Sequence, residues 1–273
     1  ALFLACTGPG SPRGVSAPAL VRATLAAVRD LPNASVVAVA VAARDTAEAD
    51  AAFRAEVAAA YADETLNVAG EGEAAPAVEA IRVRDHPPRS RRGLVVFFTG
   101  LSGSGKSTLA RALYDLVLER GNRTVTSLDG DVVRHHLSKG LGFSKEDRET
   151  NIARIGWVAA EIARHHGLAI CSPIAPFDST RKLVRRMVDD AGGGFALIHV
   201  ATPLEECERR DRKGLYAKAR AGAIPEFTGI SSPYEEPEDA LVRVDTTGRT
   251  IEDALGDVVK ALTEAGWLED DDG

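Results

Sequence analysis

The chain has 273 residues, of which 45% are hydrophobic and 27% are charged, so it can bury one large core or two smaller ones and is neither disordered nor fibrous. The 33 Lys and Arg residues are outnumbered by 40 Asp and Glu residues, and the net charge of −7 argues against a general nucleic-acid or membrane-surface binder. Three widely separated cysteines, Cys6, Cys171 and Cys207, predict neither a disulfide framework nor a zinc site, which suits a reducing cytoplasm.

Residues 1–72 alternate short apolar runs with helical patterns, which predicts a small α/β domain. The apolar opening ALFLAC is too short for a membrane span and lacks the basic residues of a signal peptide. Because the first residue is not Met, we expect the sequence to begin inside a longer reading frame. Strands are expected at Leu2–Ala5, Val36–Val41 and Leu66–Val68, and helices at Ala19–Arg29 and Thr46–Ala60.

Residues 73–92 are polar, with a Pro-Pro pair and several arginines, and are expected to form a linker. Strands and helices alternate more clearly over residues 93–273. This alternation predicts an α/β fold with a five-stranded parallel sheet, helices on both faces, and ligands at the carboxyl ends of the strands. The expected strands are Leu94–Thr99, Thr124–Leu128, Leu168–Cys171, Ala196–Val200 and Leu241–Val244, and helical patterns include Lys106–Arg120 and Lys145–His166.

The segment Gly100–Ser107, GLSGSGKS, fits G-x-x-x-x-G-K-[ST] at every fixed position. Its glycines let backbone N–H groups turn around a phosphate chain, and the following helix adds its positive amino end. Lys106 would then reach the β and γ phosphates of ATP, and Ser107 would bind Mg²⁺. The alternative is a plain Gly/Ser turn, which the strand before and the helix after disfavour. The expected ATP-binding residues of this segment are Gly100, Ser102, Gly103, Ser104, Gly105, Lys106, Ser107 and Thr108.

Two carboxylates, Asp129 and Asp131, follow the expected strand Thr124–Leu128 in the string SLDGDVVRHH. There they would hold the water shell of Mg²⁺ or an acceptor hydroxyl, although a turn also favours Asp and Gly for conformational reasons alone. His135 and His136 are expected on an exposed helix face, without a metal-binding role. The expected catalytic residues are therefore Lys106, Asp129 and Asp131, and the expected metal ligands are Ser107 and Asp129.

Two later strings add cations and aromatic rings. In LGFSKEDRETNIARIG, helix capping explains the serine and the acids, but it does not explain Phe143, or Arg148 and Asn151 on one helix face. Such a face would bind an anion and a ribose or base edge. Six basic residues lie within Arg209–Arg220 of an otherwise acidic chain. They form either a solvated basic helix or a mobile lid that closes over polyphosphates, with Phe227 stacking on a base.

These four stretches together resemble the adenylylsulfate kinase family, whose members use MgATP to phosphorylate the ribose 3′-hydroxyl of adenosine 5′-phosphosulfate (APS). The resemblance covers roughly Gly93–Leu268. It rests on GLSGSGKST, LDGD, LGFS..DR..NI.RIG and, above all, KGLY.KARAG followed by FTGI..PYE.PE. It implies a P-loop NTPase-like kinase, with ATP and APS as substrates and Mg²⁺ as cofactor.

The resemblance also implies roles for individual residues. Phe143 and Phe227 would sandwich the APS adenine, and arginines with an asparagine would hold the phosphosulfate and the sugar. Asp131 would orient the 3′-hydroxyl, although positioning and charge neutralisation should outweigh its basicity. Thr246 would pack on the adenine of ATP. The implied APS-binding residues are Asp131, Arg134, Phe143, Arg148, Asn151, Ile174, Lys213 and Phe227.

Some positions depart from the family pattern. Ala175 replaces a serine that has been discussed as phosphorylatable, so no phosphoenzyme can form there and direct in-line transfer is expected. Arg212 replaces a proline in the lid, which would loosen it. Residues 1–72 resemble a degenerate nucleotidyltransferase-like domain of ATP sulfurylase. Because VAGEG, Val68–Gly72, replaces that family's Gly-Arg-Asp-His string, a structural or partner-docking role is expected there instead of sulfurylase chemistry.

The sequence therefore predicts a cytoplasmic adenylylsulfate kinase that carries a degenerate sulfurylase-like domain. A phosphate-loop kinase for another small metabolite is one alternative, which the KARAG and FTGI strings disfavour. A non-catalytic nucleotide-binding module that docks on ATP sulfurylase is the other, which the intact Lys106, Ser107, Asp129 and Asp131 disfavour. A homodimer and association with ATP sulfurylase stay open as partners, whereas nucleic acid and membrane are not expected.

Overall fold

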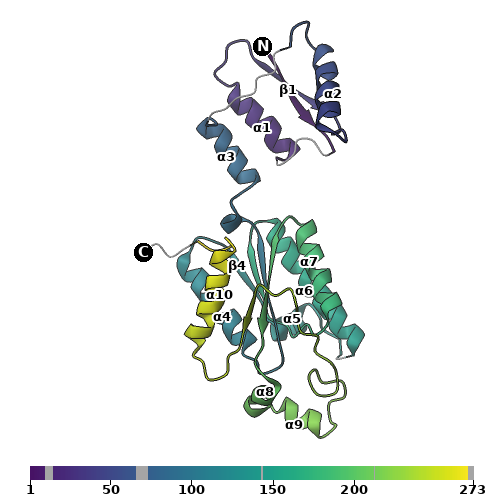
Figure 1. Ribbon diagram of the computed structural model, residues 1–273, viewed down its shortest axis with the longest axis vertical. Coiled ribbons are helices and arrows are strands. Elements are labelled where there is room, and N and C mark those ends of the chain that lie inside the picture. Colours follow the sequence, from purple (N-terminus) through teal and green to yellow (C-terminus); the bar gives the residue numbers. More distant parts are fainter. Residues whose placement is uncertain (10–14, 66–72, 143, 212, 270–273) are drawn as a thin grey trace. The chain divides into compact units, whose positions relative to one another are not determined.

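A computed structural model of the chain describes residues 1–9, 15–65, 73–142, 144–211 and 213–269 (Figure 1). The chain divides into two compact units, Ala1–Pro88 and Arg89–Gly273. Each unit has its own parallel sheet. Within the described ranges, no helix is both long enough and apolar enough to cross a membrane.

The first unit is built on a two-stranded parallel sheet in which β1 pairs with β2. Helices α1 and α2 begin at hydroxyl caps, because Ser16 and Thr46 each accept a hydrogen bond from a backbone N–H three residues later. The predicted alternation of strands and helices is confirmed for these elements, whereas Leu66–Val68 and the VAGEG string fall outside the described residues. The elements are β1 (Leu2–Thr7), α1 (Ala17–Ala27), β2 (Ser35–Ala40), α2 (Ala47–Ala59) and α3 (Pro76–Asp85).

Helix α3 lies within residues 73–92, which the sequence predicted to be a linker. It begins with a proline, which suits a first helical turn, and it half-buries Val78, Ile81 and Asp85. It packs against α1, and the Asp85 carboxylate accepts hydrogen bonds from the backbone N–H (2.7 Å) and the hydroxyl (2.5 Å) of Ser16. The linker prediction was wrong here because the polar, arginine-rich composition masked this i, i+3, i+7 spacing.

The second unit contains a five-stranded sheet whose strands are all parallel, in the order β4-β5-β3-β6-β7. All six residues of the central strand β3 are buried, as its uninterrupted apolar run LVVFFT predicts for a strand covered on both faces. The predicted sheet is confirmed, and each strand begins within two residues of the expected position. The strands are β3 (Leu94–Thr99), β4 (Val125–Leu128), β5 (Leu168–Cys171), β6 (Gly194–Val200) and β7 (Val242–Val244).

Helices cover both faces of this sheet. Figure 1 shows α4 and α10 on one face and α6 and α7 on the other. Alternate β3 residues supply the two cores: Val96 and Phe98 pack with α4 and α10, and Val95 and Phe97 pack with α6 and α7. The helices are α4 (Lys106–Arg120), α5 (Gly130–His136), α6 (Lys145–Arg164), α7 (Asp178–Asp190), α8 (Leu204–Arg210), α9 (Leu215–Arg220) and α10 (Ile251–Glu264), and a 3₁₀ turn spans Arg89–Arg91.

The predicted site segments follow the carboxyl ends of the strands. β3 lies between β5 and β6 and leads directly into the glycine-rich loop, so this loop sits at the point where open α/β sheets bind ligands. Helices α8 and α9 lie beyond the same end of the sheet (Figure 1), and Tyr216 of α9 donates a hydrogen bond to the loop carbonyl of Ser102 at 2.8 Å. The fold thus brings the loop and the predicted lid together.

Candidate active site

The loop after β3 has backbone conformations that favour glycine. Gly100 has a φ of +151°, and a Cβ atom there would lie 2.4 Å from the carbonyl oxygen of Val200, which excludes a side chain. Gly105 has a φ of +96° and immediately precedes α4. The loop therefore turns sharply into the helix and meets its positive amino end, which is the arrangement that binds phosphate groups.

Lys106 and Ser104 are both buried in this loop. Lys106 is 7% exposed, and its Nζ donates a hydrogen bond to the carbonyl oxygen of Leu101 at 2.8 Å. The Oγ of Ser104 is buried without a hydrogen-bond partner among the described residues. A buried hydroxyl without a partner is unfavourable, and a phosphate oxygen would supply the missing bond. The next two residues, Ser107 and Thr108, are exposed.

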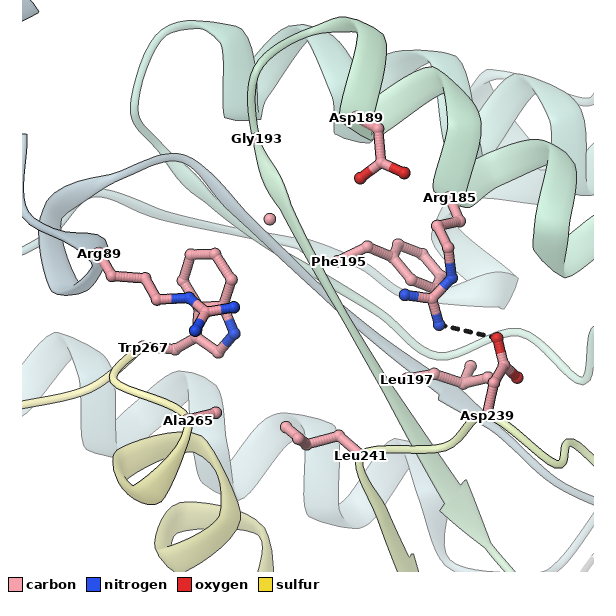
Figure 2. Close-up of a pocket in the computed structure, with 11 residues that line it drawn as sticks. Arg89, Arg185, Asp189, Gly193, Phe195, Leu197, Asp239, Leu241, Ala265 and Trp267 are labelled. Carbon is pink, nitrogen blue, oxygen red and sulfur yellow. Dashed lines mark hydrogen bonds and ion pairs between the residues drawn. The ribbon is translucent and has the colours of Figure 1, made fainter. Parts of the chain in front are cut away.

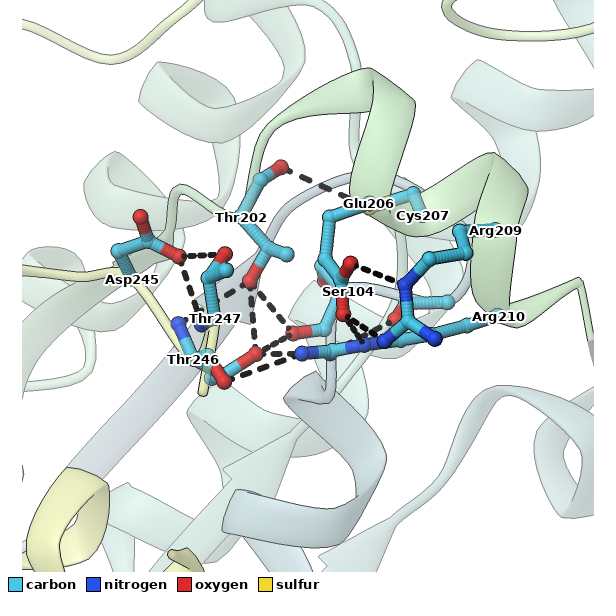
Figure 3. A network of polar contacts seen from close by, with 10 residues as sticks. Ser104, Thr202, Glu206, Cys207, Arg209, Arg210, Asp245, Thr246 and Thr247 are labelled. Atoms are coloured by element: carbon cyan, nitrogen blue, oxygen red, sulfur yellow. Dashed lines mark hydrogen bonds and ion pairs between the residues drawn. The ribbon is translucent and has the colours of Figure 1, made fainter. Parts of the chain in front are cut away.

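Hydrogen bonds from three other segments hold the loop in place (Figure 3). The carbonyl oxygen of Ser104 accepts hydrogen bonds from the hydroxyls of Thr202, after β6, and Thr246, after β7, both at 2.9 Å. Arg210 of α8 donates from Nη1 to the Thr246 hydroxyl at 2.8 Å and from Nη2 to the Thr246 carbonyl at 3.0 Å. The structure thus places Thr246 against the phosphate loop, while its predicted contact with the ATP adenine stays a prediction.

The basic cluster of the predicted lid is partly neutralised by its own acidic residues. Arg209 and Arg210 both bond to Glu206, at 2.7 and 2.8 Å, and these hydrogen bonds lower the pKa of Glu206 to about 2. Arg220 pairs with Glu208 at 2.5 Å. Pairing of this kind fixes the direction of long side chains, so Arg210 is held in place to reach Thr246.

Ser107 and Asp129 line one cavity of about 430 Å³, together with Ser127 and Ser172. The Ser172 hydroxyl donates a hydrogen bond to Oδ2 of Asp129 at 3.2 Å. Hydroxyl and carboxylate oxygens are ligands that suit Mg²⁺, which usually takes one or two protein ligands and completes its shell with water and phosphate oxygens. No group of three or more acidic, His or Cys side chains that could hold a metal occurs among the residues described. Ser107 and Asp129 therefore fit Mg²⁺ bound together with a nucleotide.

Arg148 and Asn151 lie on one side of the first turns of α6. The guanidinium of Arg148 donates to the hydroxyls of Thr228 (3.0 Å) and Ser232 (3.2 Å) and lies 3.6 Å from the Glu226 carboxylate. Asn151 is 5% exposed, and its Oδ1 has no hydrogen-bond partner among the described residues. Asn151 is thus buried, and the partly buried Arg148 is attached to the segment that carries Phe227.

Phe227 is half-buried and contacts Tyr216 edge to face, with ring centroids 4.9 Å apart. This contact joins the segment after α9 to the phosphate loop, because Tyr216 also bonds to Ser102. Lys213, at the start of the same region, is exposed. The structure therefore places Phe227 beside the residue that bonds to the phosphate loop, while its predicted stacking on the adenine stays a prediction.

The other predicted acceptor residues are only partly described. Arg134 of α5 donates from Nη1 to the carbonyl of Gly142 at 3.1 Å. Phe143, Arg212 and the side chain of Asp131 lie outside the described residues, so their predicted roles stay predictions. His135 and His136 are exposed, as predicted.

Ile174 belongs to a loop, residues 173–177, that follows β5 and is held by buried side chains. The Ile174 carbonyl accepts a hydrogen bond from Thr99 at 2.6 Å, and the Ala175 carbonyl accepts one from Arg181 at 2.9 Å. Ala175 has a φ of +44°, a conformation rarely adopted by residues other than glycine.

Four residues of this region had no individual role predicted from the sequence: Thr202, Arg181, Tyr216 and Arg210, which was counted only within the basic cluster of the predicted lid. Arg210 and Thr246 are 36 positions apart, and Tyr216 and Ser102 are 114 apart, so no local pattern joins them. Arg181, which follows Asp178 by three residues on α7, has the spacing of an ordinary surface ion pair, yet it is 1% exposed.

A second cavity, of about 360 Å³, lies near the amino end of β6 and contains none of the predicted site residues (Figure 2). Arg185 pairs with Asp239 at 2.8 Å on one side of it. On the other side, the guanidinium of Arg89 lies 4.3 Å from the ring centre of Trp267. These contacts belong to the opposite end of the sheet from the phosphate loop.

The chain matches one known protein family, and curated proteins and solved structures are similar to it in sequence. The family described as Adenylylsulphate kinase matches residues 92–245. Among curated proteins, the sulfate adenylyltransferases of Neosartorya fischeri and Aspergillus fumigatus are both 46% identical over 194 residues, which are 71% of this chain and 34% of theirs. The chain thus spans about a third of the length of the curated relatives it matches.

Two solved structures are similar as well. The Mycobacterium tuberculosis APS kinase CysC, in complex with AMPPNP and APS, is 45% identical with a TM-score of 0.60 and covers 63% of this chain and 98% of its own. The hexameric APS kinase from Thiobacillus denitrificans is 32% identical with a TM-score of 0.70 and covers 98% of this chain and 61% of its own. The second match extends over the first unit.

Proposed function

The chain belongs to the adenylylsulphate kinase family, and on this premise we propose that it is an APS kinase of sulfate activation. The γ-phosphoryl group of ATP would pass to the ribose 3′-hydroxyl of APS, giving 3′-phosphoadenylyl sulfate and ADP. One observation carries the proposal: a single set of contacts at one end of the sheet joins the phosphate loop, with its buried Lys106, to the pair Arg148 and Asn151.

The donor nucleotide would be held by the phosphate loop and the amino end of α4. Lys106 would exchange its bond to the Leu101 carbonyl for phosphate oxygens, and Ser104 would satisfy its buried hydroxyl there. Arg210 and Thr246 lie beside the loop and are placed to contact the rest of the nucleotide. Charge neutralisation and positioning are the main contributions that a protein makes to this reaction.

Mg²⁺ is the proposed cofactor, with Ser107 and Asp129 as its protein ligands. When bound, it would neutralise charge that develops on the transferred phosphoryl group. The protein's part is to fix the Asp129 carboxylate, which the Ser172 hydroxyl does through its hydrogen bond. Asp131 is proposed to orient the acceptor hydroxyl.

The acceptor would lie against α6 and the segment that carries Phe227. The planar guanidinium of Arg148 is held by two hydroxyls, so it is preorganised to bind two oxygen atoms of the phosphosulfate group. The orphan Oδ1 of Asn151 would accept a hydrogen bond from a sugar hydroxyl. Phe143 and Phe227 would stack on the adenine, with Arg134, Ile174 and Lys213 at its margins. The M. tuberculosis relative was solved with AMPPNP and APS, which supports APS as the acceptor.

Transfer would be direct, without a phosphoenzyme. Ala175 carries a methyl group and cannot be phosphorylated. An in-line displacement needs only that donor and acceptor oxygens be aligned, which the two halves of the site accomplish by binding. Turnover is therefore expected despite this departure from the family pattern.

The first unit is proposed to have a structural or partner-docking role as a degenerate sulfurylase-like domain. Its likeness to the T. denitrificans structure, which covers 98% of this chain, supports a shared architecture. That relative is hexameric, which supports self-association of this chain as at least a homodimer. We also propose that the chain associates with ATP sulfurylase and is located in the cytoplasm.

A coupled assay of ADP release, with and without APS, tests the proposed function. ADP release that depends on APS supports the kinase, and identification of 3′-phosphoadenylyl sulfate by mass spectrometry fixes the product. Nucleotide binding with no APS-dependent turnover would instead favour the non-catalytic module. A kinase for another metabolite would release ADP with that compound and not with APS. Asp131→Ala that equals the wild-type protein would remove only the role assigned to Asp131.

A further inference from the structure

We infer that Arg181 and Tyr234 are positioning residues that hold the loop of residues 173–177 in the shape required to bind the acceptor. Neither residue was assigned a role from the sequence, and neither is among the residues proposed above to touch a substrate. The inference rests on the proposed function, because it concerns the acceptor side of the same site. We call residues 173–177 the acceptor loop.

Arg181 is the most deeply buried charged side chain among the residues described, with 1% exposure. Its Nη1 donates to the carbonyl of Ala175 at 2.9 Å, and the Asp178 carboxylate lies 3.6 Å from Nη2. Nε has no hydrogen-bond partner among the described residues. A buried guanidinium that is only partly satisfied is unfavourable, and an apolar side chain would fill the same space. Packing alone therefore does not explain an arginine here.

The residue that Arg181 holds has an uncommon backbone conformation. Ala175 has a φ of +44°, which a non-glycine residue keeps only when its surroundings fix it. Its carbonyl oxygen accepts the Arg181 hydrogen bond and also lies 3.3 Å from the Thr99 hydroxyl. Two buried donors from different elements thus converge on this one peptide group.

Tyr234 completes the contacts on the other side of the loop. Its hydroxyl lies 3.1 Å from the hydroxyl of Thr99, which donates to the Ile174 carbonyl at 2.6 Å. Tyr234 is therefore the donor in the pair, and burial, which raises its pKa to about 12, keeps that proton in place. Burial also lowers the pKa of the adjacent His199 to about 4, so His199 adds no second positive charge near Arg181 at neutral pH. The next residue, Glu235, donates its N–H to the Pro176 carbonyl at 2.9 Å.

The two ends of the acceptor loop connect this clamp to both halves of the site. Just before the loop, Ser172 donates to Asp129, the proposed metal ligand. At its other end, the Phe177 ring lies 5.6 Å from the guanidinium carbon of Arg148. A shift of the loop would therefore disturb the carboxylate and the acceptor-binding arginine together, and would leave Lys106 in place.

Steady-state kinetics with each substrate varied in turn test the inference. Arg181→Met removes the buried donor at similar length, and we expect the KM for APS to rise about tenfold while the KM for ATP stays within about twofold. Arg181→Lys should recover part of that loss, because an ammonium group can still donate to the Ala175 carbonyl. Tyr234→Phe removes one hydroxyl and should raise the KM for APS about threefold. Arg185→Met, one turn further along α7, is the matched control and should behave as the wild-type protein does.

A folded Arg181→Met and a folded Tyr234→Phe with wild-type KM values for APS would overturn the inference, as would equal rises for both substrates. If Arg181→Met lacks a cooperative thermal transition, Tyr234→Phe alone decides. Wild-type protein without APS-dependent ADP release would contradict the proposed function instead. In that case, amide hydrogen exchange at Ile174, Ala175 and Phe177 tests the clamp: faster exchange in Tyr234→Phe than in Arg185→Met supports it, and equal exchange overturns it.

Discussion

Arg210 donates two hydrogen bonds to Thr246, one to its hydroxyl at 2.8 Å and one to its carbonyl at 3.0 Å. A third, at 3.3 Å, goes to the carbonyl of Gly103 in the phosphate loop. Arg210 thus joins α8, the segment after β7 and the loop that would hold ATP.

Arg210→Ala should weaken ATP binding in particular. Loss of this junction leaves Thr246 without its charged partner and loosens α8, so we expect the KM for ATP to rise about tenfold with little change in the KM for APS. Arg209→Ala is the matched control, because Arg209 shares the partner Glu206, whereas the hydrogen bonds to Thr246 come from Arg210. Similar KM values for ATP in the two variants would contradict the role given to Arg210.

Lys106→Ala should abolish most turnover. Lys106 is buried in the loop, and its Nζ lies 2.8 Å from the Leu101 carbonyl. Its charge is therefore already inside the loop that would hold the phosphate oxygens. Loss of a preorganised charge at the transferred group typically lowers kcat by about 100-fold or more. Lys260→Ala, on the exposed side of α10, serves as the control. APS-dependent ADP release by Lys106→Ala within threefold of wild type, roughly, would exclude the proposed role.

Much of the fold could be predicted because each strand of the second unit leaves a local signal. β3 is an unbroken apolar run that is buried on both faces, and the turn after it needs glycine at Gly100 for steric reasons. Helix α3 was not predicted, because its polar, arginine-rich composition outweighed its helical spacing and its stabilising contacts are with Ser16 and α1, far away in the sequence. Its own composition is that of a linker.

The site could be predicted where a residue's role depends on its neighbours in sequence. Lys106 and Ser107 have their positions set by the loop and the start of α4. Arg210 and Arg181 could not be identified, because their partners are carbonyl and hydroxyl groups that only the folded chain brings near. A backbone carbonyl leaves no mark in the sequence, so the arginine that it binds looks like any surface arginine.

Stability should depend on pH through His199. Burial lowers the pKa of His199 to about 4 in the folded protein, from 6.5 in the unfolded chain. Between these values the unfolded chain binds the proton and the folded protein does not, so the free energy of unfolding falls as the pH drops from 6.5 toward 4 and levels off below it. The loss should be on the order of 3 kcal/mol.

Urea unfolding of wild type and His199→Gln at pH values across this window measures the effect. Both tryptophans, Trp157 and Trp267, lie in the second unit, so their fluorescence reports the unit that contains His199. The variant should lose most of the pH dependence in that window, whereas His136→Gln, at an exposed position, should keep it. Identical pH profiles for wild type and His199→Gln would show that His199 titrates normally.

Two glycines of the second unit should respond to alanine in opposite directions. A Cβ on Gly194 would lie 2.0 Å from the Trp267 ring, so Gly194→Ala forces that ring out of its site and should lower the free energy of unfolding by about 1–3 kcal/mol. A Cβ on Gly256, in α10, meets no atom within 4 Å. Gly256→Ala should therefore raise it by about 0.5–1 kcal/mol through helix propensity. Tryptophan fluorescence during urea unfolding measures both, and a stabilised Gly194→Ala would contradict the packing described for Trp267.

Ser172→Ala should alter the response to Mg²⁺ more than the binding of either nucleotide. The Ser172 hydroxyl donates to the Asp129 carboxylate at 3.2 Å, and its removal leaves that ligand less well oriented. We expect the Mg²⁺ concentration for half-maximal activity to rise about tenfold, and chelation by EDTA to stop turnover of the wild-type protein. Ser127→Ala is the matched control, because Ser127 lines the same cavity, whereas the hydrogen bond to Asp129 described here comes from Ser172. Equal Mg²⁺ titrations for the two serine variants would mean that Asp129 does not depend on Ser172, and an EDTA-resistant activity would remove Asp129 and Ser107 as metal ligands.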